Sequence, residues 1–208
     1  MAGDTRARML AAATEALRRS GVAGMSFTEV LGASGAARGA IYHHFPGGKA
    51  QLVAEAAGQH GAEVLGHLAT LSGDSPTEVV RAFLAAVRPV VAASAAGSGC
   101  AVAAVALSPT GPADPVGPTG AAGAGDASVT AGAGTTEVAA AAFDSWVGQL
   151  TATLTTAGAP PAEAAELASA LIALLEGAHV LCRAAGDLAP FDRAASAVDA
   201  LVRSRYPD

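Results

Sequence analysis

Residues 26–46 read SFTEVLGASGAARGAIYHHFP, and this stretch opens with the signals of a helix start. Ser26 can cap the first turn, and Glu29, three residues later, can reach back to the Ser26 amide. Met25 and Val30 flank the cap at the two positions of a hydrophobic staple, which fixes the direction in which the chain enters a helix. The pattern therefore predicts a short helix that begins just after Ser26.

The same stretch then predicts a second short helix. The first helix should end near Ser34 and Gly35, and the second should begin at Ala36 or Ala37. It should end before Pro46, because proline disfavours helical geometry in the residue that precedes it. Two short helices joined by a tight glycine-containing turn predict a helix-turn-helix unit.

The composition of the whole chain favours an all-α protein. Of the 208 residues 56 are alanine, which has the highest helix propensity, and only 4% are aromatic. Charged residues make up 14%, against a typical value of about 25%, so the chain does not have the composition of a charge-rich disordered protein. Apolar residues at helical spacing place further helices along the chain. The expected ranges are 5–20, 48–71, 76–96 with a kink at Pro89, 100–107, 136–157, 161–185 and 190–205.

One long segment lacks such a pattern. Residues 108–136 contain 11 glycines and prolines, no aromatic residue and no basic residue. This composition predicts a flexible insertion. The expected organisation is thus a three-helix helix-turn-helix head at 1–50 and a larger helical body at 51–208, with the insertion at 108–136 inside the body.

Charge is divided unevenly between these two parts. Residues 1–50 hold six basic and three acidic side chains, a net charge of +3, whereas the remainder carries −9. A small basic head on an acidic body is typical of a protein whose head alone meets a polyanion.

On the second helix of the helix-turn-helix, Ala37, Ile41 and Phe45 are spaced to pack inward. The residues expected on the outer face are Arg38, Gly39, Tyr42 and His43. A major groove admits one helix, where glycine allows close approach and arginine can form a bidentate contact with guanine or a phosphate. Phosphate contacts are expected from Ser26, Tyr42, His43 or His44, and Lys49. Taken singly, a tyrosine at this spacing can be a core residue and adjacent histidines can be merely solvated.

As a whole, residues 27–46 resemble the N-terminal DNA-binding domain of TetR-family repressors, and the block Tyr42-His43-His44-Phe45 is the strongest element. The chain is most similar to the LmrA/YxaF-type members in the run Pro46-Gly47-Gly48-Lys49 and in the segment that starts at Gly99. The insertion has no counterpart in the usual pattern of the family. The resemblance implies a homodimer that binds a palindromic double-stranded DNA operator and is released by an unidentified small-molecule inducer.

The resemblance also implies that the last two helices pair with their copies in a second chain. The strip expected to do so comprises Leu167, Leu171, Leu174, Leu175, Ala178, Leu188, Val198, Leu201 and Val202, unless it forms an internal core. The inducer is expected among the body helices. The body side chains with suitable chemistry are Cys100, Phe143, Trp146, Glu176, His179 and Arg183, and none of them forms a recognisable motif.

Other classes of protein fit the sequence less well. No hydrolase, metal or phosphate-loop motif is present, so we expect neither an enzyme nor a cofactor or metal. The uncharged stretch 89–113 is interrupted by glycines and prolines, and the two cysteines suit a reducing cytoplasm, so we expect a cytoplasmic protein without a membrane span. A thiol-based redox sensor that uses Cys100 and Cys182 remains an alternative, as does a helical adaptor without DNA binding.

Overall fold

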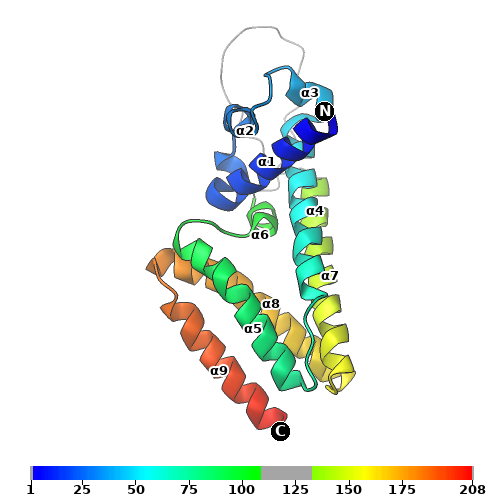
Figure 1. Ribbon diagram of the computed structural model, residues 1–208, viewed down its shortest axis with the longest axis vertical. Helices are drawn as coiled ribbons and strands as arrows, with labels where there is room; N and C mark the ends of the chain where they lie inside the picture. Colours follow the sequence, from blue (N-terminus) through cyan, green and yellow to red (C-terminus); the bar gives the residue numbers. More distant parts are fainter. Residues whose placement is uncertain (1, 109–132, 208) are drawn as a thin grey trace. The chain divides into compact units, whose positions relative to one another are not determined.

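The computed structural model describes residues 2–108 and 133–207, and every regular element within these ranges is a helix, as the composition predicts. Figure 1 shows their order along the chain. The helices are α1 (Ala2–Gly24), α2 (Phe27–Ser34), α3 (Ala40–His44), α4 (Gly48–Leu68), α5 (Pro76–Ala95), α6 (Ala101–Ala106), α7 (Ala133–Thr156), α8 (Pro161–Ala185) and α9 (Ala189–Arg205).

The described residues fall into two compact units. Unit 1 comprises those of 1–60 and 101–140, and unit 2 comprises those of 61–100 and 141–208. Helices α4 and α7 each contribute to both units. The helix-turn-helix lies in unit 1, together with α6 and the first turns of α7.

Unit 1 is built around α1, which packs against α2 and α6. Gly21 interrupts the helical path of α1 with φ of 68°, a left-handed value that glycine adopts without strain, so the predicted stop after Ser20 is present as a kink. The core consists of large apolar side chains that are at most 1% exposed: Met9, Leu17, Met25, Val30, Ile41, Phe45 and Leu52.

Helix α2 begins and ends as its sequence predicts. The Glu29 amide donates to Ser26 Oγ at 3.1 Å, and Gly35 adopts the left-handed conformation (φ 66°) that closes many helix C-termini. The Glu29 carboxylate forms an ion pair with Arg19, whereas the sequence predicted that it would reach back to the Ser26 amide.

Replacing Ser26 by alanine is expected to lower the free energy of unfolding by about 1 kcal/mol, because the Glu29 amide loses its acceptor. Urea unfolding followed by circular dichroism measures the change. Ser196→Ala, at an exposed position of α9, is the matched control and should change stability by less than about 0.5 kcal/mol. Equal effects of the two substitutions would contradict the capping role.

Helix α3 is shorter than predicted. It begins at Ala40, whereas the sequence analysis placed its start at Ala36 or Ala37, and Ala37 is exposed where inward packing was predicted. The Ala40 amide donates to the Ala37 carbonyl at 2.9 Å, so Ala37 begins a turn that leads into the helix. Ile41 and Phe45 are buried as predicted.

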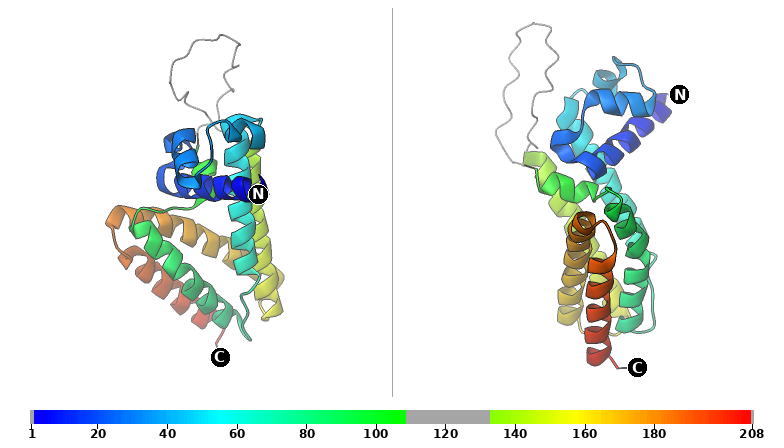
Figure 2. Two further views of the ribbon diagram at one scale, coloured as in Figure 1. Left: turned by 45° about the horizontal axis from the view of Figure 1, so that its top comes forward. Right: turned by 90° about the vertical axis from the view of Figure 1, so that its left-hand side faces the viewer.

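Unit 2 is a bundle in which α5, α8 and α9 each pack against the other two. Figure 2 shows these three helices side by side. Its fully buried side chains include Phe83, Val91, Trp146, Leu154 and Leu171. Helix α5 continues through Pro89, where the sequence predicted a kink; Pro89 is exposed.

Helix α7 begins at Ala133, so residues 133–136 are helical although the predicted insertion included them. Residues 109–132 of that predicted insertion lie outside the described residues. Of the described helices, α8 alone is long and apolar enough to span a membrane by these two criteria, with a mean hydropathy of 1.5 over the tested window and 39% of that window buried. Length and composition of this kind are equally found in core helices of globular proteins.

Candidate functional site

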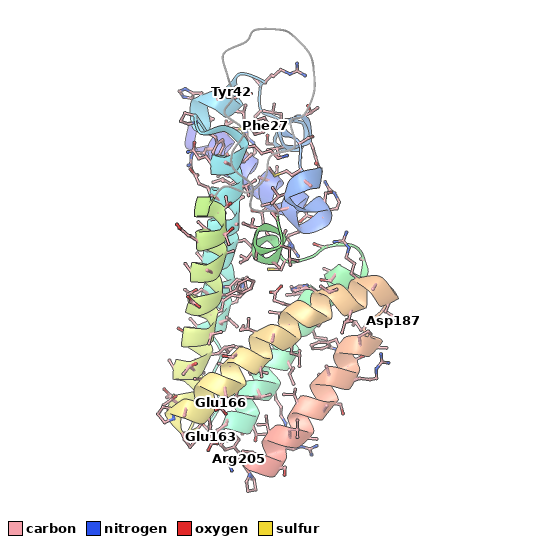
Figure 3. The ribbon with its side chains drawn as sticks, turned by 180° about the vertical axis from the view of Figure 1, so that it is seen from behind. Phe27, Tyr42, Glu163, Glu166, Asp187 and Arg205 are labelled. Carbon is pink, nitrogen blue, oxygen red and sulfur yellow. The ribbon has the colours of Figure 1, made fainter. Side chains whose placement is uncertain are left out.

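The most exposed aromatic side chain of unit 1 is Tyr42, on α3. It is 64% exposed, so both its ring and its hydroxyl are accessible to a partner molecule. The ring of Phe27, on the first turn of α2, meets it edge-on with a centroid distance of 6.0 Å and an interplanar angle of 79°. Figure 3 labels both residues. This contact restricts the Tyr42 ring, most of which stays exposed.

Arg38 and Gly39 are both exposed, as predicted, but they precede α3 and do not lie on it. Gly39 is the N-cap residue of α3, and a Cβ added there would meet no atom within 4 Å, so the backbone is open to a close approach. The Arg38 side chain therefore extends from the turn between α2 and α3, next to the surface that bears Tyr42.

The two histidines differ in exposure. His43 is exposed and His44 is half-buried, and their rings contact each other edge-on with centroids 5.0 Å apart. Since both rings lie at the end of α3, His43 has the better access to a partner molecule.

The remaining two predicted DNA contacts are less accessible. Ser26 is half-buried and its hydroxyl oxygen already accepts from the Glu29 amide, although the first amides of α2 lie beside it. Lys49 is only 7% exposed, in the first turn of α4. A phosphate contact by Lys49 stays a prediction and requires its ammonium group to extend outward.

The arrangement suits a duplex partner. The exposed residues of this segment combine a guanidinium, an open backbone, a phenol and an imidazole, which are groups that bind phosphates and base edges. Residues 26–46 supply all of them. The sequence analysis gave no role to Phe27, whose ring contacts that of Tyr42 from the preceding helix. The signal for this role was the placement of two aromatic residues on neighbouring elements of one motif.

The predicted body residues form two groups, both within unit 2. In the first group, His179 Nδ1 lies 2.5 Å from Ser94 Oγ of α5, and both residues are buried. Glu176 precedes His179 by one turn of α8, and the Cys100 thiol approaches its carboxyl group. Neither Glu176 oxygen is exposed, and neither accepts a well-formed hydrogen bond from the described residues.

Burial raises the pKa of Glu176 to about 7, and the Cys100 thiol offsets this rise only in part. Desolvation disfavours the charged form of a carboxyl group, which explains the direction. Ser94 was missed by the sequence analysis, because a serine on an apolar helix carries no signal until its partner on another helix is known.

The second group consists of Phe143 and Trp146 on α7. Their rings meet edge-on with centroids 5.1 Å apart, and the indole N–H of Trp146 donates to the Gly61 carbonyl at 2.9 Å. Trp146 is buried and Phe143 is half-buried. Arg183 belongs to neither group, since its side chain is exposed one turn beyond His179.

Glu176 makes the free energy of unfolding depend on pH. Because the folded state raises the pKa of Glu176 from 4.5 to about 7, its protonated form stabilises the fold below about pH 4.5. This contribution is lost as the pH rises through 7. Urea unfolding between pH 5 and pH 8 should show a loss of at most about 3 kcal/mol from this group.

Glu176→Gln is expected to remove that part of the pH dependence, because glutamine does not ionise. Glu166→Gln, at an exposed position of the same helix, is the control and should leave the pH dependence intact. A Glu176→Gln variant with the pH profile of the unaltered chain would contradict the assignment.

The described residues contain no group of three or more His, Cys, Asp or Glu side chains that could hold a metal ion.

Comparisons with known proteins agree with this geometry. Residues 9–56 match the profile of bacterial regulatory proteins of the TetR family, and residues 118–197 match the C-terminal domain of LmrA/YxaF-like transcriptional regulators. The second match begins inside the segment 108–136. Part of that segment therefore has a counterpart in the family, contrary to the expectation from the sequence.

Individual relatives are similar over different lengths. An uncharacterized HTH-type transcriptional regulator, Rv0196 of Mycobacterium tuberculosis, is 32% identical over 90% of this chain and 88% of its own length. The HTH-type transcriptional regulator LmrA of Bacillus subtilis is 36% identical over 39% of this chain and 45% of its own length. A TetR-family regulator structure from Agrobacterium tumefaciens superposes with a TM-score of 0.74 at 21% identity, covering 97% of this chain and 99% of that one, which supports the fold.

Proposed function

Since the chain belongs to the TetR family of bacterial transcriptional regulators and is similar to the LmrA/YxaF-like branch, we propose that it is a ligand-responsive repressor acting in the cytoplasm. Two copies bind a palindromic operator, and a small molecule that binds in the helical body releases them. Members of this family are regulators and not enzymes, so the chain is a DNA-binding regulator without a catalytic site.

The observation that carries the proposal is the surface of Arg38, Gly39, Tyr42 and His43, all of which are exposed among the described residues. Arg38 binds a base edge or a phosphate, and Gly39 allows the backbone to approach the major groove closely. Tyr42, held by Phe27, donates its hydroxyl to a phosphate oxygen, with further phosphate contacts from His43 or His44, Ser26 and Lys49.

The exposed faces of α8 and α9 support the homodimer. Leu171, Leu175 and Ala178 of the predicted strip are buried within one chain, so that part of the strip forms internal core. A different face of α8 stays uncovered. It bears Ala170, Ala173 and Leu181, which are exposed, and Gly177, which is half-buried; Leu181 is 58% exposed.

Helix α9 adds Ala197, Ala200 and Leu201, and Leu201 is 69% exposed. Small residues allow helices to approach closely, and exposed leucines among them indicate a partner surface. A second copy that presents the same two helices would complete a four-helix bundle. The α8 and α9 ends are held together within the chain by Glu163, which accepts hydrogen bonds from Arg205 Nε at 3.0 Å and the Tyr206 hydroxyl at 2.8 Å. Figure 3 shows Glu163 and Arg205 at this end of the two helices.

We assign the ligand response to the helical body. In the proposed organisation, residues 1–50 bind DNA and residues 51–208 bind the ligand and the second copy. The ligand contacts proposed are Cys100, Phe143, Trp146, Glu176, His179 and Arg183.

The buried positions of Cys100 and Cys182 do not favour a thiol-based redox sensor, because reactive thiols are accessible and held in an electropositive environment. The exposed face of the helix-turn-helix likewise does not favour an adaptor without DNA binding.

Recovery of the genomic DNA that the purified chain retains, followed by sequencing, tests the proposal. We expect enrichment of a short palindrome close to genes that the protein regulates, and the neighbouring genes then provide candidate inducers. Retention of random fragments only, at low and at moderate salt, would contradict sequence-specific regulation.

A further inference from the structure

Unit 2 contains buried polar atoms that lack partners among the described residues. They are both carboxyl oxygens of Glu176 and the hydroxyl oxygen of Ser98. The Cys100 thiol approaches the Glu176 carboxyl group, so the loop after α5 reaches α8 at this point, and Ser98 lies two residues before Cys100 on that loop. Nearly all buried polar atoms in folded proteins form hydrogen bonds, so each exception requires an explanation, of which a bound water, ion or ligand is one.

The surrounding groups do not neutralise the Glu176 carboxylate. From α8, His179 is the nearest titratable neighbour in sequence, and its Nδ1 is engaged with Ser94 of α5. Arg183 is exposed, one turn beyond His179 on α8. On α5, Arg88 forms an ion pair with Asp192 of α9. From the loop, the Cys100 thiol approaches the carboxyl group, and a thiol is a weak donor.

The loop between α5 and α6 carries few side chains. Ser98 stands between two glycines, and a Cβ added at Gly97 would meet no atom within 4 Å. The only side chain between Ala96 and Cys100 is therefore the Ser98 hydroxymethyl group, which can donate to or accept from a guest molecule.

We propose that Glu176, Ser98 and the His179–Ser94 pair form a binding site for the head group of a small organic cation with N–H donors, such as a protonated amine or an amidinium. The buried carboxylate accepts two N–H bonds and neutralises the charge, whereas an anion would be repelled and a neutral guest would leave the carboxylate uncompensated. This inference names the ligand class for the ligand response proposed above and rests on that proposal. The raised pKa of Glu176 agrees with it, because the site disfavours a carboxylate that has no cation.

Thermal unfolding of the full chain at pH 8 with benzamidinium, benzamide and benzoate tests the site, because the three probes share one ring and differ in charge. Phenethylammonium and phenethyl alcohol form a second pair. At ten times the Kd, a cation should raise Tm by about 3 to 5 °C. Benzamide, phenethyl alcohol and benzoate should produce no comparable shift.

Glu176→Gln should abolish the shift, whereas Glu166→Gln should retain it. The shift in the unaltered chain should also shrink at pH 6, where Glu176 becomes protonated. Equal shifts with neutral probes, an undiminished shift in Glu176→Gln, or no shift with either cation would overturn the proposal. In the last case a water molecule held by a neutral carboxyl group would account for the buried oxygens.

DNA binding measured in the same buffer separates this inference from the proposed function. If the chain retains its operator but no cation binds, only the ligand class is wrong. If a cation binds at Glu176 and no operator is retained, the binding site stands and the proposed repressor function fails.

Discussion

Arg38→Ala is expected to lower operator affinity by at least roughly 30-fold. A bidentate contact between arginine and guanine contributes about 1 to 3 kcal/mol, and a dimer on a palindrome makes it twice. Fluorescence anisotropy with a labelled operator measures the loss. The structure makes the substitution suitable, because Arg38 is exposed in the turn before α3 and its removal leaves no cavity.

Arg193→Ala, at an exposed position of α9, is the matched control and should leave affinity within about twofold, the level of a neutral surface change. The salt dependence identifies the kind of contact. A base contact by Arg38 leaves the slope of log K against log salt unchanged, whereas a phosphate contact lowers the slope by about 0.9 per half-site. Equal affinities of Arg38→Ala and the unaltered chain would show that the assigned surface does not bind DNA.

Tyr42→Phe provides a smaller test on the same surface, because it removes only the hydroxyl and keeps the ring on Phe27. Its effect on operator affinity should therefore be smaller than that of Arg38→Ala. A loss of affinity for every duplex alike is the expected pattern for a phosphate contact.

The double variant Leu181→Glu, Leu201→Glu is expected to convert the dimer into a monomer. Both side chains are exposed in one chain, so glutamates at these positions are tolerated there, but two copies would bring four carboxylates into an apolar interface. Sedimentation equilibrium should show half the mass of the unaltered protein, with an unchanged circular dichroism spectrum.

Loss of the dimer should also weaken operator binding by roughly 100-fold or more, because the second half-site no longer benefits from the high effective concentration that a linked first site provides. Ala85→Glu, at an exposed position of α5, adds the same charge elsewhere in unit 2 and should leave both mass and affinity unchanged. A double variant that stays dimeric would place the interface on another face.

Local signals in the sequence were sufficient for the helix ends that depend on one or two residues. Ser26 caps α2 and Gly35 ends it. Both features depend on the residue itself, since a serine side chain can accept from a helix amide and glycine readily adopts left-handed geometry. The start of α3 was predicted too early, since Ala36 and Ala37 favour helix, yet the turn that positions Ile41 and Phe45 in the core requires non-helical backbone there.

Features that depend on which helices pack together could not be predicted from the sequence. The sequence assigned the apolar strip of α8 to a second chain, whereas Leu171 and Leu175 are buried within one chain and Leu181, outside the predicted strip, is exposed. Periodicity identifies an apolar face but does not reveal which helices of the same chain pack against it. Likewise, Glu176 was a candidate on chemistry alone. Its buried oxygens follow from the loop after α5, which the sequence does not place against α8.

The most direct test of a dimer that binds DNA through the helix-turn-helix surface is the mass of the complex with its selected palindrome, measured by sedimentation at low and at moderate salt. We expect two chains per duplex, a single half-site that binds much more weakly, and an affinity that falls steeply as salt increases. One chain per duplex with equal affinity for half-site and palindrome, or no binding at low salt, would contradict the account.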